Sequence, residues 1–207
     1  MKIMKTIIEK IDKNQKNTDI IREAGRILKE GGLVAFPTET VYGLGADALN
    51  EDAAKKIYAA KGRPSDNPLI IHITNMKALD KIVSEVPEKA VKVAEKYWPG
   101  PLTMIFNKSD IVPYGTTGGL DTVAVRMPVD EIAREVIDAG GGYIAAPSAN
   151  TSGRPSPTTA QHVAEDLTGR VDMIVDGGAV EIGVESTILD VTVEPPMILR
   201  PSKARLE

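Results

Sequence analysis

The sequence of 207 residues contains no cysteine and only two histidines. The lack of cysteine excludes disulfides and thiolate metal sites, and it is typical of proteins from a reducing cytosol. With two histidines, a multi-histidine metal site is not expected. We therefore expect no metal held by side chains alone, and any metal to be Mg²⁺ that arrives with phosphates.

Long apolar runs are lacking too. No stretch approaches the roughly 20 apolar residues that span a bilayer. In the N-terminal segment MKIMKTIIEKI, charges interrupt the apolar residues, which argues against a signal peptide. We therefore expect a soluble, cytoplasmic protein with no membrane partner.

Aromatic residues make up only 4% of the chain, and an overall positive charge is also missing. Hydrophobic residues reach 42%, so aliphatic and alanine side chains must form the core. The net charge of −4 shows no global basic excess of the kind that favours nucleic-acid binding, although a local basic cleft stays open.

Familiar catalytic motifs are also absent. The chain has no G-x-x-x-x-G-K-[ST] loop and no G-x-G-x-x-G fingerprint, and Gly43-Leu44-Gly45 is too short to count as a phosphate loop. It has no G-x-S-x-G elbow, and two histidines offer few bases for a serine nucleophile. Nothing in the sequence therefore indicates covalent catalysis.

What the chain does contain is an interleaved series of helical and strand patterns without a composition shift that would mark a linker. The patterns predict helices over 18–30, 51–61, 75–84, 87–97, 130–139 and 159–168. They predict strands over 3–11, 33–36, 69–73, 102–106, 122–127, 143–146, 172–176, 186–191 and 197–200. We expect a single α/β domain over 1–207, with a twisted mixed sheet flanked by helices and a large open pocket. A purely parallel sheet is disfavoured because several strands follow one another without a convincing helix.

Polar residues follow several of the predicted strands. The residues at these strand ends are Thr38, Glu39, Thr40, His72, Arg126, Ser148, Asn150 and Arg200. Open α/β sheets bind ligands beyond the carboxyl ends of their strands. If these ends converge, two arginines, a histidine and several hydroxyls suit an anion or a carboxylate. An antiparallel strand would point its end the other way.

Each of these residues also has a structural interpretation. His72 could be a hydrogen-bonded core histidine, and Arg126 could belong to a structural ion pair, because a charge in an apolar strand needs a partner. Lys61 and Arg63 flank a helix C-terminus, where the helix dipole favours cations. The long loop over 147–158 could be plain turn chemistry, although long loops of this kind are often functional.

Six sequence blocks, in order, carry a resemblance to a known family. They are FPTETVYGLGADA (36–48), KGRPSDNPLIIHI (61–73), TVAVRMP (122–128), APSANTSGRPSPT (146–158), ESTILDV (185–191) and ILRPS (198–202). Over about residues 17–202 the chain resembles the YrdC-type threonylcarbamoyl-AMP synthase family. It looks like the catalytic domain alone, without the C-terminal extension of longer members.

The resemblance implies an ATP-using nucleotidyltransferase. Members combine L-threonine, bicarbonate and ATP into threonylcarbamoyl-AMP and pyrophosphate, and Mg²⁺ accompanies the ATP. A separate threonylcarbamoyl transferase complex then modifies adenosine 37 of tRNA. By similarity, the L-threonine site comprises Thr40, His72, Arg126, the backbone of Ala146, and Ser186. By similarity, the ATP site comprises Lys61, Arg63, Asn67, Thr122, Ser148, Ser156 and Arg200. The resemblance assigns no single catalytic base.

Two other functions compete with this synthase hypothesis. A non-catalytic module that binds tRNA or double-stranded RNA would fit a concave basic surface, but the acidity of the chain and its few aromatics argue against it. A carbamoyl-adenylate domain of the hydrogenase-maturation type would need zinc-finger-like regions that a chain without cysteine does not provide.

Overall fold

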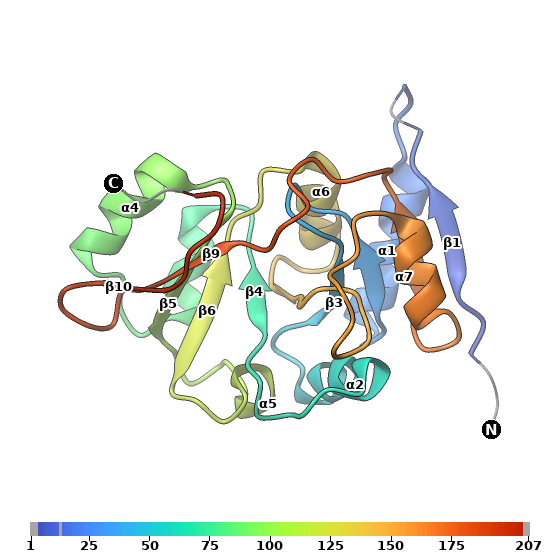
Figure 1. Ribbon diagram of the computed structural model, residues 1–207. Coiled ribbons are helices and arrows are strands. Elements are labelled where there is room, and N and C mark those ends of the chain that lie inside the picture. The colour runs from blue at the N-terminus through green and yellow to red at the C-terminus, as the bar shows by residue number, and fades with distance from the viewer. Residues whose placement is uncertain (1–3, 13, 205–207) are drawn as a thin grey trace.

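The computed structural model describes residues 4–12 and 14–204, and it contains one ten-stranded sheet (Figure 1). In sheet order the strands are β1 (Ile7–Lys10), β8 (Met173–Asp176), β2 (Val34–Phe36), β3 (Gly43–Asp47), β7 (Ile144–Ala145), β4 (Ile70–His72), β6 (Thr122–Arg126), β5 (Leu102–Asn107), β9 (Thr187–Asp190) and β10 (Met197–Arg200). In Figure 1, β1 lies at the right end of the molecule and β10 at the left.

The sheet is mixed, as the sequence predicts. Four neighbouring pairs are parallel, namely β1–β8, β2–β8, β4–β6 and β5–β9. The pairs β2–β3, β3–β7, β4–β7, β5–β6 and β9–β10 are antiparallel. The expectation of a single α/β domain with a mixed sheet is therefore confirmed.

Helices flank this sheet. They are α1 (Thr18–Lys29), α2 (Glu51–Lys61), α3 (Leu79–Ile82) after a 3₁₀ turn at Met76–Ala78, α4 (Glu88–Tyr97), α5 (Tyr114–Thr117), α6 (Glu131–Ala139) and α7 (Ala160–Leu167). Capping residues fix several of their starts. Asn50 accepts hydrogen bonds from two backbone amides at the start of α2, and Asp130 accepts one from the amide of Ala133 at the start of α6. None of the helices in the described part of the chain has both the length and the apolar character that crossing a bilayer requires.

One face of the sheet is covered along its length by the larger hydrophobic core. This core joins α2, α3, α4 and α7 to residues of the strands β2 to β9, with Ile57, Leu79 and Val163 among its buried side chains. On the other face, a smaller core joins α1 and α6 to β8, β2 and β7. The contact of α1 with α6 is close: a Cβ on Gly25 would lie 2.5 Å from the carbonyl oxygen of Ala139.

The second face is covered over only part of the sheet. Among the described residues, none from β4, β5, β6 or β9 belongs to the smaller core. Alternate residues of these strands that face the larger core are buried: Ile71, Met104, Val125 and Leu189. Their neighbours on the opposite face are half-buried: Ile70, Ile105, Ala124 and Ile188. The period-two alternation of a strand therefore leaves this part of the sheet partly open on one side.

Several predicted elements differ from the observed ones. The strand β3 was not predicted, and the helix expected over 75–84 is split into a 3₁₀ turn and the short α3. The strand predicted over 3–11 is observed as Ile7–Lys10, and residue 3 lies outside the described residues. The other predicted elements are present within a few residues of their expected ends.

The polar strand ends do not all lie at one edge of the sheet, so the antiparallel alternative holds for part of it. The antiparallel pair β4–β7 sends the carboxyl end of β7 in the direction opposite to that of β4. By the same pairing rules β2 runs with β7, whereas β6 and β10 run with β4. The polar residues still meet, because the loop after β2 folds over the open face.

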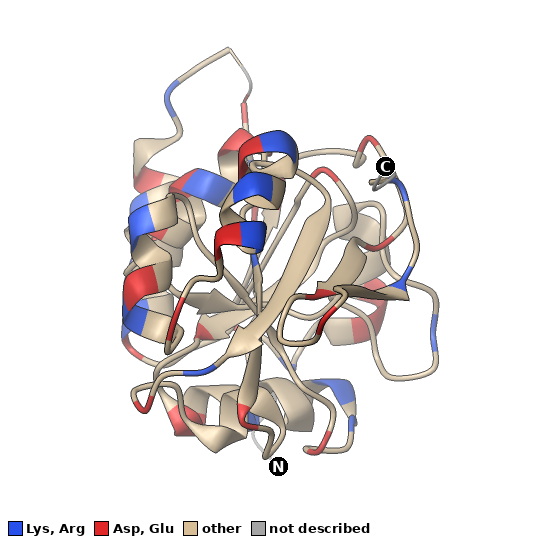
Figure 2. Cartoon of the chain, turned by 90° about the vertical axis from the view of Figure 1, so that its left-hand side faces the viewer, with Lys and Arg blue, Asp and Glu red and all other residues tan. Residues whose placement is uncertain are grey.

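Charges of both signs are mixed over the surface. Figure 2 shows acidic and basic segments interspersed along the ribbon in its view. On α1, for example, Arg26 pairs with Glu23 at 2.8 Å and with Glu30 at 2.5 Å.

Candidate functional site

Arg126 is the centre of a buried polar cluster on the partly open face. It ends β6 and is 4% exposed. Its Nη2 donates to Oε1 of Glu39 at 2.5 Å, and its Nη1 donates to Oγ1 of Thr40 at 2.8 Å. Its Nε donates to the carbonyl of Gly100 at 3.4 Å. The structural interpretation, that Arg126 sits in an ion pair, is therefore correct for this state of the protein.

The loop between β2 and β3 brings Glu39 and Thr40 to Arg126. The Thr38 hydroxyl donates to the carbonyl of Val41 at 2.8 Å and closes a tight turn. Backbone amides of Ile182 and Gly183 donate to the carbonyls of Glu39 and Thr40 at 2.9 Å. The loop is thus fixed between the sheet and the segment that precedes β9.

His72 lies beside Arg126, in register with it on the neighbouring strand β4. Its ring is buried, and Nδ1 lies 3.1 Å from the carbonyl of Ile70, so that Nδ1 carries the proton and donates. Burial and the adjacent Arg126 guanidinium lower the pKa of His72 to about 3. The imidazole is therefore neutral at physiological pH and can accept a hydrogen bond from a ligand.

Ser186 and Ala146 complete this group. Arg126 pairs in register with Thr103 on β5, and the Thr103 hydroxyl lies 2.8 Å from that of Ser186. The backbone amide of Ala146 donates to the carbonyl of Ile70 at 2.9 Å. We call the following residues the inner cluster: Thr40, His72, Thr103, Arg126, Ala146 and Ser186. Each member is at most 5% exposed. The structure therefore brings together all five residues that the family resemblance assigns to threonine.

A second group lies around the loop after β7. Lys61, the last residue of α2, donates from Nζ to the carbonyl of Ser148 and, at 2.6 Å, to that of Asn150. Burial lowers the pKa of Lys61 to about 8, and the neighbouring Arg63 contributes to this shift. Arg63 donates to the carbonyl of Pro68 at 3.3 Å, while its buried Nε has no partner. A buried donor without a partner is available to a ligand.

Glu185 lies among the cations of this second group. Its Oε2 accepts from Nη1 of Arg200, and its Oε1 accepts from the Ser156 hydroxyl at 3.0 Å. Burial lowers the pKa of both Lys61 and Arg63, and the negative charge of Glu185 offsets part of this shift in each case. Arg200 additionally donates from Nε to the carbonyl of Ser186 at 3.0 Å, which connects it to the inner cluster.

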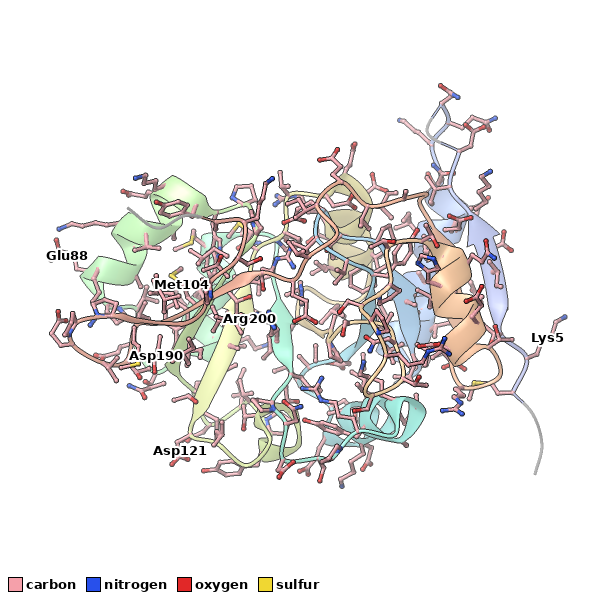
Figure 3. The ribbon with its side chains drawn as sticks, in the orientation of Figure 1. Lys5, Glu88, Met104, Asp121, Asp190 and Arg200 are labelled. Carbon is pink, nitrogen blue, oxygen red and sulfur yellow. The ribbon has the colours of Figure 1, made fainter. Side chains whose placement is uncertain are left out.

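We call the following residues the outer cluster: Lys61, Arg63, Ser148, Ser156, Glu185 and Arg200. In Figure 3, Arg200 lies toward the middle of the molecule, whereas Glu88 and Asp121 lie at its periphery. A groove of about 920 Å³ is lined by Ser156, Glu185 and Arg200. The structure thus places five of the seven residues expected to bind ATP in one group.

The two remaining residues expected at the ATP site lie farther from the charged centre. Thr122 begins β6 and is half-buried, four positions before Arg126 and on the same face of that strand. Asn67 is exposed, and its carbonyl accepts from the Tyr58 hydroxyl at 3.0 Å. Among the described residues, no hydrogen bond or ion pair joins either side chain to the outer cluster. The assignment of all seven residues to ATP stays a prediction.

A larger groove of about 1200 Å³ lies elsewhere, between α1 and α6. From the loop after β2 it includes Pro37, Thr38 and Glu39, but it includes no residue of the outer cluster. Its size alone does not make it the functional site, because the polar groups that converge are those of the two clusters.

Sequence reasoning missed Glu185 and Thr103, and it placed Glu39 at a strand end without giving it a role. Glu39 and Glu185 lie within the family-like blocks FPTET and ESTILDV, yet neither was assigned a role. Thr103 lies in a predicted strand with no signal of its own. No signal in the sequence separates Glu39, which is buried, or Glu185, which is half-buried, from an exposed carboxylate.

Comparisons with known proteins show what the chain is similar to. A family model described as Telomere recombination (Sua5/YciO/YrdC) matches residues 26–202. The chain is 58% identical to the threonylcarbamoyl-AMP synthase of Pyrococcus abyssi over 187 residues, which cover 90% of this chain and 55% of that protein. It is 52% identical to the Bacillus subtilis threonylcarbamoyl-AMP synthase, with coverage of 97% and 58%.

A solved structure is also similar. The crystal structure of P. abyssi Sua5 complexed with L-threonine superposes with a TM-score of 0.92 at 56% identity, covering 95% of this chain and 57% of that one. The chain thus spans a little over half the length of the relatives named here. The family model alone covers most of the sequence, and the chain belongs to the Sua5/YciO/YrdC family.

Proposed function

We propose that this chain is an L-threonylcarbamoyladenylate synthase. It would combine L-threonine, bicarbonate and ATP into threonylcarbamoyl-AMP and pyrophosphate, which are the substrates and products implied by the resemblance. Relatives that are 58% and 52% identical carry the name threonylcarbamoyl-AMP synthase, and a similar structure was solved with L-threonine. These names support the proposal without testing it on this chain.

The observation that carries the proposal is the nesting of the two clusters. Members of the inner cluster are at most 5% exposed, so the inner cluster suits a small ligand that becomes fully enclosed. In the outer cluster, Arg63, Ser148, Ser156, Glu185 and Arg200 are only half-buried. This arrangement matches a small amino acid held by the inner cluster and a nucleotide held by the outer cluster. The hydrogen bond from Arg200 to Ser186 joins the two clusters.

The chemistry of the clusters fits the proposed reaction. Attack of a carbamate oxygen on the α-phosphorus needs charge neutralisation and alignment more than a nucleophilic side chain. Lys61, Arg63 and Arg200 supply three positive groups for the phosphates. Hydroxyls of Thr40 and Ser186 can pair with a substrate hydroxyl, and such a site rejects analogues that lack this group.

Mg²⁺ bound to the triphosphate would neutralise further charge. Among the described residues, no group of three or more His, Asp or Glu side chains is arranged to hold a metal ion. Glu185 is the carboxylate that lies among the phosphate-site cations, so it fits as a single protein oxygen near a metal whose other ligands are phosphate and water. The binding of Mg²⁺ through ATP therefore remains part of the proposal.

The test of the proposed function is pyrophosphate release. The purified chain, with ATP and Mg²⁺, should release pyrophosphate only when both L-threonine and bicarbonate are present. Mass spectrometry should detect threonylcarbamoyl-AMP in the same reaction. Unchanged pyrophosphate release without threonine would contradict the proposal. Delivery of the product to a transferase complex and tRNA is part of the same proposal and is tested by adding those components.

A further inference from the structure

The pairing of Glu39 with Arg126 leaves one oxygen of the Glu39 carboxylate without a partner. Glu39 is 4% exposed, and one oxygen, Oε1, accepts from Arg126. The other oxygen, Oε2, is buried and accepts no hydrogen bond. An ionised oxygen that is buried without a donor costs free energy, and such a cost is tolerated where a ligand supplies the donor.

The Arg126 guanidinium is also incompletely used. Its three bonds, to Glu39, Thr40 and Gly100, employ three of the five N–H donors of a guanidinium. Donors therefore remain next to an oxygen that needs one. A positive and a negative group thus lie side by side in a buried pair, each with spare hydrogen-bonding capacity.

The charges of this pair decide which ligand it suits. A lone buried arginine would suit a simple anion, because the anion would neutralise it. The Arg126–Glu39 pair is already neutral, and a net anion would leave an uncompensated negative charge in a buried site. A zwitterion adds no net charge, and its two groups match the two partners.

Nearby groups agree with this polarity. Asp130 lies close enough that Glu39 contributes, after burial, to raising the pKa of the Asp130 carboxyl. Asp130 itself caps α6 through the amide of Ala133 at 2.9 Å. Two carboxyl groups, those of Glu39 and Asp130, therefore lie close to one another near Arg126, whereas His72 beside Arg126 is neutral.

We propose that Glu39 binds the α-ammonium group of the amino-acid substrate through Oε2, while Arg126 binds its carboxylate. Glu39 would thus select zwitterionic amino acids over simple hydroxy acids. The identity of the amino acid as threonine rests on the proposed function, but the selection of a zwitterion follows from the buried pair itself.

The test compares two ligands that differ only in the group assigned to Glu39. L-threonine carries the ammonium group, whereas 3-hydroxybutyrate keeps the carboxylate and the hydroxyl and lacks the amine. Calorimetric titration of the wild-type chain should show threonine binding at least tenfold more tightly. Equal binding of the two ligands to the wild-type chain would overturn the inference without any variant.

The variant Glu39→Gln sharpens the test. Its amide oxygen can still accept from Arg126, which places the amide N–H₂ where Oε2 was and faces it toward the ammonium group. Threonine binding should weaken at least tenfold, whereas 3-hydroxybutyrate binding should hold or improve because the site becomes net positive. Equal loss of both ligands would indicate a merely structural role and overturn the inference.

Controls separate these outcomes from misfolding. Asp166→Asn removes another buried carboxylate, 6% exposed and paired with Arg154 at 2.8 Å, and should leave threonine binding unchanged. Thermal unfolding should show that each variant folds. If Glu39→Gln does not fold, Glu39→Asp keeps the charge and should retain the preference for threonine. Loss of threonine-dependent pyrophosphate release with zwitterion selectivity intact would refute the proposed function alone.

Discussion

The neutral, buried His72 makes the stability of the fold depend on pH in a calculable way. Its pKa is about 3 in the folded protein and about 6.5 in an unfolded chain. As the pH falls below 6.5, the unfolded chain takes up a proton that the folded protein refuses. The stabilisation is therefore fully present above pH 6.5 and is lost as the pH falls toward 3.

The size of this effect follows from the two values. One pKa unit corresponds to about 1.4 kcal/mol, so the contribution of His72 to the free energy of unfolding should fall by about 2 kcal/mol between pH 7 and pH 5. The variant His72→Asn can still donate to the Ile70 carbonyl but does not titrate in this range. The wild-type chain should therefore lose about 2 kcal/mol more than the variant between these two pH values.

Urea unfolding at pH 7 and pH 5 measures this difference directly. The exposed His162 provides the control, because its replacement by asparagine should leave the wild-type pH dependence in place. If wild type and His72→Asn lost the same free energy between the two pH values, the ring would be solvated or charged in the folded state. The assignment of a neutral acceptor beside Arg126 would then fail.

Three other predictions test the clusters and the packing. Arg126→Ala should weaken threonine binding more than ATP binding, and Arg63→Ala should do the reverse; equal losses of both ligands in separate titrations would contradict two subsites. Because the pKa of Lys61 is about 8, a non-hydrolysable ATP analogue should bind roughly tenfold more weakly at pH 9 than at pH 7, and Lys61→Arg should flatten this dependence. A flat wild-type profile would show that the Lys61 ammonium does not contribute to binding. Gly25→Ala should stabilise α1 by about 1 kcal/mol through helix propensity, but the new Cβ would clash with the Ala139 carbonyl at a cost of about 1–3 kcal/mol. The melting temperature should therefore fall. A rise would show that α1 and α6 separate freely.

Local signals made most of the fold predictable. The asparagine cap and the acidic first turn of α2 define where that helix begins, and Gly62, with φ of 61°, ends it. The strand β3 had no such signal, because its sequence GLGAD lacks β-branched residues. Gly45 is required there by packing: a Cβ would lie 2.7 Å from the Phe36 ring. Tertiary contacts, which sequence patterns do not display, decide that segment.

The site was predictable in its members but not in its geometry. The residues of the inner cluster except Thr103 were identified from the family resemblance, and polar residues at strand ends pointed to Thr40, His72 and Arg126 from the sequence alone. The direction of each strand could not be predicted, because an apolar run has the same sequence pattern whether its neighbour is parallel or antiparallel. The roles of Glu39 and Glu185 could not be foreseen either, because an exposed and a buried carboxylate look alike in a sequence.

The long loops closed by the site contacts have a consequence for how the protein folds. Thr40 and Arg126 are 86 positions apart, Lys61 and Ser148 are 87, and Thr103 and Ser186 are 83. Closing such long loops costs chain entropy before the contacts stabilise the fold, so these contacts slow folding relative to local contacts. A growing chain cannot assemble the binding cations until β9 and β10 have emerged from the ribosome. The binding site can therefore form only after residue 200 has been synthesised, and the sheet likewise depends on distant contacts, because β1 and β2 both pair with β8.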